Sequence, residues 1–315
     1  MANGFTVSSL TDNPKELLRP IWTGTVNYSD TIAAAAGGAI SLFTNVKGSS
    51  LKMPRLSQVV NYKDADCSFS ASGGTTITQA TMTLNDSEYN DLWCVRDLEN
   101  KFTNGYLPAG QRYENLGALQ GEIVMEIEKG VANKNEDYIW TGDNSNAGQW
   151  DGYNTLLSDA IGAATVTATG VGAITESNAY DSVKALVKAA MADKYLGTLA
   201  NRGGLSLWLG HDAMYNYDLD YQATVGTTIH AQDFKPGFVQ GTRIQFRPVA
   251  GLTGTSYMYL VPDGNLAVGT DLLADTADLK FGLDQYEKNV WATLMFKMGC
   301  QFLDVTKGKY HVLAT

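Results

Sequence analysis

The side chains that most often do chemistry are few in this sequence and lie far apart. Its three histidines and three cysteines are His211, His230, His311, Cys67, Cys94 and Cys300. No two histidines are four residues apart, and no histidine stands near a cysteine at the spacing of a zinc site. The cysteines are odd in number, contain no CxxC pair and form no evident disulfide framework, which fits a reducing compartment. We therefore predict no metal site.

Short catalytic motifs are also absent. The sequence holds no GxSxG nucleophile elbow, no HExxH zinc motif and no GxxxxGK[ST] phosphate loop. We predict a protein that is not an enzyme, with no catalytic, cofactor-binding or metal-binding residues. One enzymatic alternative stays open, a carboxylate-dependent β-rich hydrolase, because paired acid–base carboxylates leave no short motif. A deep acidic pocket would favour it.

The composition is that of a folded chain with an acidic balance. The chain has 315 residues, of which 44% are hydrophobic and 18% charged, so it can bury a sizeable core in one large or two ordinary domains. Its 23 basic and 33 acidic residues give a net charge of −10. This charge argues against a protein that grips phosphate backbones, but it is compatible with a wall that encloses DNA at a distance.

No targeting segment is apparent. Residues 1–20 lack a basic region followed by an apolar run, so we expect no secretory signal. The apolar stretch Thr31–Ile40 is too short to span a bilayer. We expect a soluble protein that is made inside the cell.

Residues 1–50 have the character of an arm. Apolar side chains are sparse there, and Pro14 and Pro20 interrupt any long helix. A segment that cannot bury itself is either disordered or lies on another surface, and the apolar pair Ile21-Trp22 favours the second.

Residues 51–84 predict two strands around a turn at Ser72–Gly74. Thr, Val and Ile favour strands, and Gly73-Gly74 is a turn signal. Few positions are strongly apolar, and a long isolated hairpin is marginal in water. We expect this hairpin to lie on a partner surface or at the edge of the protein's own sheet.

The clearest periodic segments are a helix and a long strand. Apolar residues recur at spacings of three and four over Gly110–Val131, which predicts a helix that frays at Gly130–Asn135. From Val290 to Phe302 every even position is apolar, which predicts a half-buried strand of roughly 43 Å. A long helix beside a long strand indicates an elongated unit.

Residues 150–272 predict a second unit. A helix is expected from an N-cap at Thr175 to about Tyr195, with Met191 on its inward face. The predicted strands are Leu205–Leu209, residues 242–247, and the stretches SYMYLVP and NLAVGTDLL on either side of the tight-turn dipeptide Asp263-Gly264. Helix and strands in mixed order predict an α+β unit.

This order of elements resembles the Hong Kong 97-type fold of tailed-bacteriophage major capsid proteins. Three stretches resemble the corresponding passages of that family: TLNDSEYNDLWCVRDLEN before the long helix, DYIWTGD after it, and FGLDQYEKNVWATLMFKMGCQFLD at the last strand. The resemblance covers nearly the whole chain, and it lies in the layout because the family has no signature motif. The domains that it implies are an N-terminal arm (1–50), an extended loop (51–84), a peripheral domain with a spine helix (85–149), an axial domain (150–272) and the C-terminal strands of the peripheral domain (273–315).

The resemblance implies a function in a shell. Copies of a major capsid protein form the hexamers and pentamers of an icosahedral shell that encloses the double-stranded DNA genome of a tailed phage. The implied partners are other copies of the chain, separate scaffolding, portal and decoration proteins, and packaged DNA that is contacted non-specifically, but no membrane. The implied location is the virion, after assembly in the cytoplasm of the bacterial host.

Two departures from the family limit what carries over. Some relatives have a scaffolding segment before the arm, whereas this sequence begins with the arm, so any scaffolding is expected to be a separate protein. Some relatives cross-link a loop lysine to an asparagine of a neighbour; only Lys63 lies in the hairpin here and no asparagine stands out, so no cross-link is predicted.

Two further alternatives stay open. An encapsulin-like nanocompartment shell protein resembles the same fold but holds protein cargo, and the long polar arm favours the phage form. A phage tail or adhesion protein would form tubes or trimers.

Overall fold

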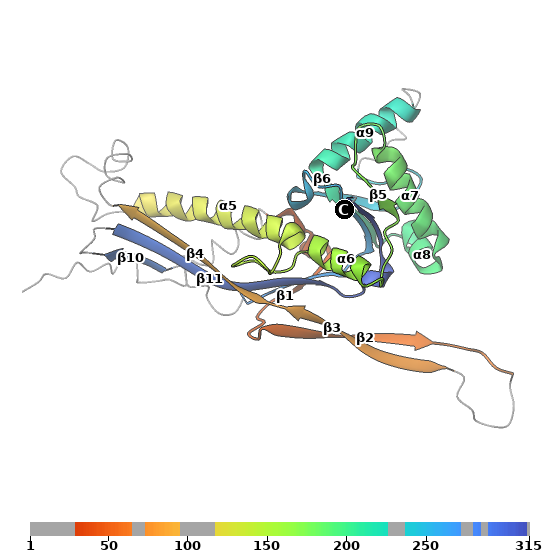
Figure 1. Cartoon of the computed structure of the whole chain (residues 1–315), viewed down its shortest axis with the longest axis horizontal. Helices are drawn as coiled ribbons and strands as arrows, with labels where there is room; N and C mark the ends of the chain where they lie inside the picture. Colours follow the sequence, from red (N-terminus) through yellow and green to blue (C-terminus); the bar gives the residue numbers. More distant parts are fainter. Residues whose placement is uncertain are drawn as a thin grey trace, which may run out of the picture.

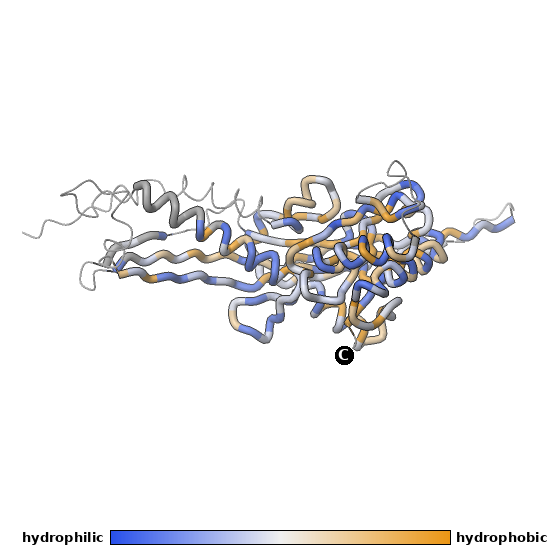
Figure 2. The backbone as a smooth tube through the Cα atoms, turned by 90° about the horizontal axis from the view of Figure 1, so that it is seen from above, coloured by the Kyte–Doolittle hydropathy of each residue, from blue (hydrophilic) through white to orange (hydrophobic). Residues whose placement is uncertain are grey.

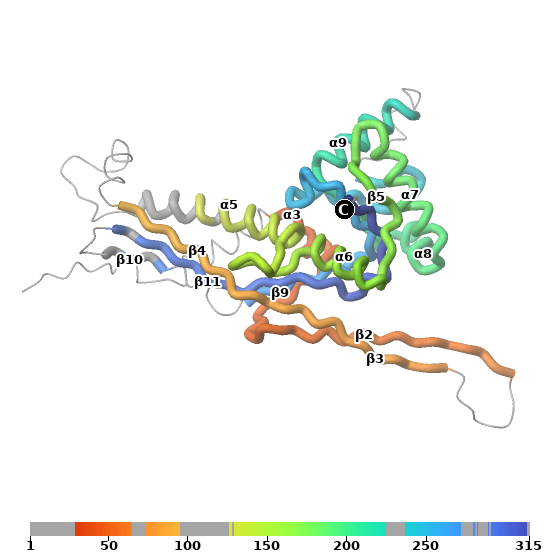
Figure 3. Tube along the Cα trace, in the orientation of Figure 1, coloured from red at the N-terminus to blue at the C-terminus, as the bar shows by residue number. Residues whose placement is uncertain are grey.

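The computed structural model describes residues 29–64, 73–94, 117–225, 237–271, 280–284 and 289–313. In this part of the chain the molecule is elongated, with two long projections that leave a central body in opposite directions (Figure 1). Seen from above, apolar and polar positions alternate along the long strands (Figure 2). One projection is a two-stranded ribbon, and the other is a sheet that runs beside a long helix (Figure 3).

The first sheet has five strands and is organised around β11. Its strands are β1 (Ile40–Phe43), β4 (Asn85–Cys94), β9 (Leu266–Thr270), β10 (Lys280–Asp284) and β11 (Asn289–Phe302). Along β11, β4 pairs on one edge, and β10 and then β9 pair on the other, all antiparallel. The predicted half-buried strand is confirmed, since alternate residues from Ala292 to Phe302 are buried.

The long helix α5 (Gly117–Thr141) extends further than predicted. It neither ends at Val131 nor frays at Gly130–Asn135, and the predicted start at Gly110 lies outside the described residues. Burial explains the extension, because Ile139 and Trp140 are completely buried. A glycine within a helix costs about 1 kcal/mol relative to alanine, which is less than the burial of one large apolar side chain contributes.

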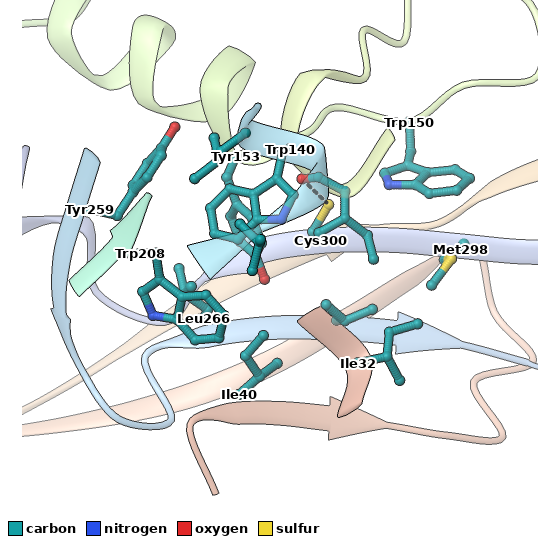
Figure 4. Close-up of a cluster of buried hydrophobic side chains, with 14 of the residues drawn as sticks. Ile32, Ile40, Trp140, Trp150, Tyr153, Trp208, Tyr259, Leu266, Met298 and Cys300 are labelled. Atoms are coloured by element: carbon teal, nitrogen blue, oxygen red, sulfur yellow. Dashed lines mark hydrogen bonds between the residues drawn. The ribbon is translucent and has the colours of Figure 1, made fainter. Parts of the chain in front are cut away.

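The main core lies where α5, α6 (Tyr153–Gly162) and the two sheets meet (Figure 4). The ring of Trp140 has its centroid 5.1 Å from that of Tyr153, 5.7 Å from that of Trp208 and 5.3 Å from that of Tyr259. Trp208 and Tyr259 belong to the second sheet, so this aromatic cluster fixes the second sheet against α5.

The second sheet has the order β5-β12-β8-β6-β7. Its strands are β5 (Gly170–Val171), β6 (Leu205–Gly210), β7 (Gln245–Val249), β8 (Met258–Pro262) and β12 (Lys309–Val312), and its helices are α7 (Ala179–Ala192), α8 (Lys194–Arg202) and α9 (His211–Val225). The predicted buried strand is confirmed as β6, every residue of which is buried. The strand predicted over residues 242–247 is β7, shifted towards its C-terminal end.

The single helix predicted from Thr175 to Tyr195 is two helices. The first, α7, begins at Ala179, so Thr175 is not its N-cap. Asp193 has an extended backbone and accepts hydrogen bonds from the N–H groups of Tyr195 and Leu196, which starts α8 and turns the chain. Met191 is 38% exposed and does not face inward.

The chain passes from the second sheet to the first and then back again. β8 and β9 follow one another in the chain, yet they lie in different sheets, so Asp263-Gly264 is not the tip of a hairpin. Gly264 has a φ of 79° and carries the chain from one sheet to the other. β12 likewise returns to the second sheet after β11. The predicted boundary between the axial domain and the C-terminal strands of the peripheral domain lies at 272/273. The chain changes from one sheet to the other near residues 263 and 304 instead.

Part of the predicted arm belongs to the body. Residues 1–28 lie outside the described residues. From Ser29 the chain forms α3 (Asp30–Ala33), the 3-10 turn η1 (Ala34–Gly37) and β1, which pairs in parallel with β9. Ile32, Ala39 and Ile40 are buried in the body. The predicted arm of residues 1–50 is therefore too long at its C-terminal end.

The predicted hairpin is confirmed as the ribbon of β2 (Ser50–Val59) and β3 (Gly74–Thr83). The strands pair antiparallel from Ser50↔Thr83 to Val59↔Gly74. Gly74 therefore lies in β3, and the predicted tight turn at Ser72–Gly74 is wrong. Residues 60–73 connect the strands, and 65–72 of these lie outside the described residues.

Candidate assembly surfaces

The ribbon β2–β3 presents apolar side chains to solvent. Leu56 and Ile77 are partners across the two strands and are 66% and 74% exposed. Val59 and Val60, near the outer end of β2, are 58% and 61% exposed. A two-stranded ribbon has no core of its own, so these side chains are expected to be covered by a partner.

Among the described residues, the body holds the root of the ribbon through several contacts. The small apolar cluster at the root consists of Val46, Met53, Met82, Leu84 and Ala267. Beside it, the Arg55 guanidinium lies 2.9 Å from the Asp304 carboxylate. The Gln301 amide donates a hydrogen bond of 2.9 Å to the carbonyl oxygen of Thr81. These contacts fix the direction in which the ribbon leaves the body.

A buried carboxylate anchors the first described residues to α5. Glu136 is 2% exposed and accepts hydrogen bonds from the Ser29 hydroxyl at 2.6 Å, the Thr31 hydroxyl at 2.5 Å and the Thr31 N–H at 3.1 Å. The Trp140 indole N–H donates to Glu136 at 3.3 Å. Ser29 also caps α3 by accepting from the N–H of Ile32. Ser29, the first described residue, is therefore fixed to the body.

The electrostatics of Glu136 are those of a charge inside the protein. Burial raises the pKa of this carboxyl above its ordinary value of 4.5, and the Asp30 carboxylate adds to the rise. Hydrogen bonds from Ser29 and Thr31 oppose it, because they stabilise the charged form. We assign Glu136 an anchoring role, since its hydrogen bonds with Ser29 and Thr31 tie the first described residues to α5.

A groove of about 650 Å³ runs between α5 and the strands β4 and β11. The apolar side chains that line it are Tyr89, Trp93, Ile127, Val131, Tyr138, Trp150 and Phe296. Glu88, Asp91 and Glu126 also line it, together with one basic residue, Lys134. The groove is thus apolar inside and acidic in balance, with three carboxylates and one ammonium group.

The histidines and cysteines are scattered. His211 lies at the start of α9, with its Nε2 3.4 Å from the Asp30 carboxylate, and His311 is buried in β12. Cys94 is exposed at the end of β4. Cys300 is buried in β11, and this burial raises the pKa of its thiol. His230 and Cys67 lie outside the described residues.

The described residues do not test the hydrolase alternative, and they include the three carboxylates that line the groove. Across the described part of the chain, no group of three or more histidine, cysteine or carboxylate side chains could hold a metal ion. A small polar pocket beside the second sheet is lined by Asn201 and residues 238–243, and no carboxylate is among these residues. None of the helices within the described ranges is both long and apolar enough to span a membrane.

Sequence reasoning missed both Glu136 and the groove. A signal for Glu136 was present, because Ala132, Glu136, Ile139 and Trp140 follow the spacing of one helix face, which places the carboxylate among buried residues. The groove had no such signal, since it forms between a helix and two strands that are distant in the sequence.

The comparisons with known proteins rest on structure. No protein-family model matches the chain, and no curated protein matches its sequence. Among solved structures, the chain is similar to the capsid of Myoviridae phage XM1, with 11% identity over 89% of this chain and 92% of that chain and a TM-score of 0.54. It is similar to the capsid of the native GTA particle, with 13% identity over 90% of each chain and a TM-score of 0.53.

A third similar structure is the procapsid of satellite phage P4 including its size determination (Sid) protein. The identity is 11% over 94% of this chain and 90% of that chain, with a TM-score of 0.53. Likeness at such low identity shows the fold. The chain has the predicted α+β, Hong Kong 97-type capsid fold over nearly its whole length.

Proposed function

We propose that this chain is the major capsid protein of a tailed bacteriophage. Its copies would form hexamers and pentamers, and these would close into an icosahedral shell around double-stranded DNA. The protein would act structurally, without a catalytic site, and would be found in the virion after assembly in the host cytoplasm. Its domains would be an N-terminal arm, the ribbon as extended loop, a peripheral domain built on α5 and the first sheet, and an axial domain built on the second sheet.

The observation that carries this proposal is the ribbon β2–β3. It projects beyond the body with Leu56 and Ile77 exposed, while the solved chains that share the fold over about 90% of their length are named as capsids and a procapsid. A ribbon that cannot bury itself gains stability only on a partner surface. In a closed symmetric shell, each copy repeats the same contact, so modest contacts give a stable whole.

The proposal includes partners other than the chain itself. The P4 procapsid structure contains a size determination protein. We propose that this chain too assembles with a separate scaffolding protein, and that portal and decoration proteins complete the particle. Its net charge of −10 supports a wall that contacts packaged DNA weakly and non-specifically.

The direct test is to express the full chain and examine it by size-exclusion chromatography and negative-stain electron microscopy. We expect rings of five and six copies or closed shells. A chain that stays monomeric up to its solubility limit would contradict assembly of the chain by itself, and assembly would then require the scaffolding protein proposed above. A matched variant, Leu56→Ser with Ile77→Ser, should lower the assembled fraction, while Gln58→Ser with Gln79→Ser on the same ribbon should not.

The content of purified shells separates the phage reading from the nanocompartment reading. Nuclease-protected DNA in shells isolated from infected or induced cells would support a phage capsid. A defined protein cargo without DNA would support an encapsulin-like compartment instead. Tubes or trimers would point to a tail or adhesion protein.

A further inference from the structure

We propose that the exposed face of α8, together with the residues beside it, binds the phosphate backbone of DNA. We call this surface the α8 strip and define it by residues 193–202, 238–243 and 305–309. The inference rests on the proposed function and deepens it, because it names the surface through which the shell contacts its packaged DNA. Three observations carry it: the charge of the strip, its geometry, and the polar character of its exposed side chains.

Positive charge is concentrated in the α8 strip. Its charged residues are five basic ones and one acidic one, namely Lys194, Arg202, Arg243, Lys307, Lys309 and Asp193. The strip thus carries a net charge of +4 within a chain of −10, so the rest of the chain carries −14. Among the residues that the structure describes, no carboxylate forms an ion pair with any of the five basic side chains. These charges therefore remain available to an anionic partner.

The strip follows one face of a short helix. Tyr195 and Arg202 are seven residues apart in α8, so they lie on the same face, about 10 Å apart along the axis. The Lys307 ammonium lies 5.6 Å from the centroid of the Tyr195 ring, which places η4 (Val305–Lys307) beside the start of α8. The helix lies on the side of the second sheet that faces away from α5 (Figure 1). Its length of about 14 Å matches roughly four successive phosphates of one DNA strand.

A polar pocket lies at the far end of the strip. It has a volume of about 370 Å³ and is lined by Asn201 and residues 238–243. Arg243 is the one charged residue of this lining, and its backbone N–H donates to the carbonyl oxygen of Ala200 at 2.9 Å, which fixes it beside the end of α8. The Nε2 of Gln240 is buried and has no acceptor in the described part of the chain. Guanidinium and amide groups both donate to phosphate oxygens, so this lining suits one phosphate group.

The exposed side chains of α8 suit DNA better than another protein surface. Apart from the cations they are Tyr195, Thr198 and Asn201, and no aliphatic side chain of this helix is exposed. Interfaces between proteins have an apolar centre, whereas interfaces with DNA are polar and positively charged. Tyrosine, threonine and asparagine side chains commonly donate to phosphate oxygens. The strip therefore matches a DNA backbone rather than the surface of a neighbouring copy.

Titration of a fluorescent DNA duplex with the full-length, unassembled subunit tests the role of the charges. We expect binding at low salt, followed by anisotropy, that weakens by about ten-fold or more when three cations of the strip are neutralised together. The slope of log K against log salt should also become shallower, because fewer phosphates are contacted. The three substitutions are Lys194→Gln, Arg202→Gln and Lys307→Gln.

A matched control separates the strip from the net charge of the chain. It makes the same change of charge at three exposed lysines outside the strip and should leave the affinity unchanged. Its substitutions are Lys52→Gln, Lys129→Gln and Lys134→Gln. Equal weakening by both sets, or no binding of DNA by the wild type at low salt, would overturn the inference.

Chemical labelling of lysines in particles tests which surface the DNA covers. Shells isolated with their DNA, and the same shells emptied of it, are treated with a small acylating reagent and analysed by mass spectrometry. We expect Lys194 and Lys307 to be acylated less in filled than in empty shells, whereas Lys52 and Lys129 should be acylated equally in both. Equal acylation of Lys194 and Lys307 in the two kinds of shell would overturn the assignment to DNA. If it is low in both, a neighbouring copy covers the strip instead.

The results separate this inference from the proposed function. Shells that contain DNA but show no change in the acylation of Lys194 and Lys307 would refute the strip as the DNA-binding surface and leave the capsid proposal intact. Subunits that bind DNA through the strip, but never form shells that hold DNA, would support the binding surface while contradicting the capsid proposal.

Discussion

Glu136 shows how a single polar side chain is used inside the body. A carboxylate taken out of water loses free energy unless hydrogen bonds replace its hydration. Here the donors are Ser29, Thr31 and Trp140, so the same bonds that satisfy the charge also fasten α3 to α5. The cost of burial is still visible in the raised pKa of the carboxyl.

This raised pKa makes the stability of the subunit depend on pH. A carboxyl whose pKa is higher in the folded than in the unfolded state contributes most stability below its ordinary value of 4.5. That contribution is lost as the pH rises through the folded-state pKa. Glu136→Gln removes the titration, so the free energy of unfolding of the wild type, minus that of Glu136→Gln, should fall as the pH is raised from about 4.5.

Urea unfolding of the unassembled subunit at a series of pH values measures this difference. Glu126→Gln makes the same chemical change at a side chain that is 76% exposed on the same helix, and it serves as the control. A difference that stays constant or rises with pH would contradict the assigned burial of charge at Glu136.

At the scale of elements, α5 and the residues just after it tolerate glycine for two different reasons. Gly130 is exposed within the helix, and a methyl group at its Cα would meet no other atom within 4 Å. Gly142 follows the helix, and a methyl group there would collide with the carbonyl oxygens of Tyr138 and Trp150. The first glycine is conformationally costly, whereas the second allows two backbone segments to approach closely.

The two glycines therefore predict opposite effects of the same substitution. Gly130→Ala should raise the free energy of unfolding by about 0.5–1 kcal/mol, because alanine loses less backbone entropy in a helix. Gly142→Ala should lower it, since the backbone must shift to accept the methyl group. Urea unfolding of both variants checks the pair, and a destabilising Gly130→Ala would mean that the helix is interrupted there.

At the scale of the whole molecule, the shape is suited to contacts with copies of itself. The ribbon and the sheet beside α5 project from opposite ends of the body (Figure 1). Contacts between unlike ends of identical copies are heterologous, and they close into a ring when the rotation between copies allows it. An elongated subunit with two projections thus supplies more surface for neighbours than a compact one of the same length.

The N-terminal residues provide the test at this scale. Deletion of residues 1–27 keeps Ser29 and Thr31, so we expect a subunit with near wild-type stability that does not assemble normally. Deletion of residues 1–31 also removes the partners of Glu136 and the cap of α3, so stability should fall by roughly 1–3 kcal/mol as well. Electron microscopy and urea unfolding distinguish the two variants. Normal shells from the shorter deletion would refute a role of the segment in assembly.

The sequence by itself determined those elements whose pattern is local. Strict alternation along residues 290–302 predicted β11, because a strand with one buried face must alternate. The threonine-rich stretches predicted the ribbon, because Thr, Val and Ile favour strands. The order of these elements along the chain was enough to indicate the fold. The scarcity of histidines, cysteines and catalytic motifs led to the prediction of a structural protein, which remains part of the proposed function.

Only the tertiary structure decided what depends on contacts between distant residues. The dipeptide Asp263-Gly264 has the sequence of a tight turn, yet β8 and β9 enter different sheets because each finds its partners elsewhere in the chain. The extension of α5 beyond Gly130 depends on the aromatic cluster around Trp140, to which two sheets contribute. The groove likewise exists only where α5 packs on β4 and β11, since no short stretch of sequence contains both of its walls.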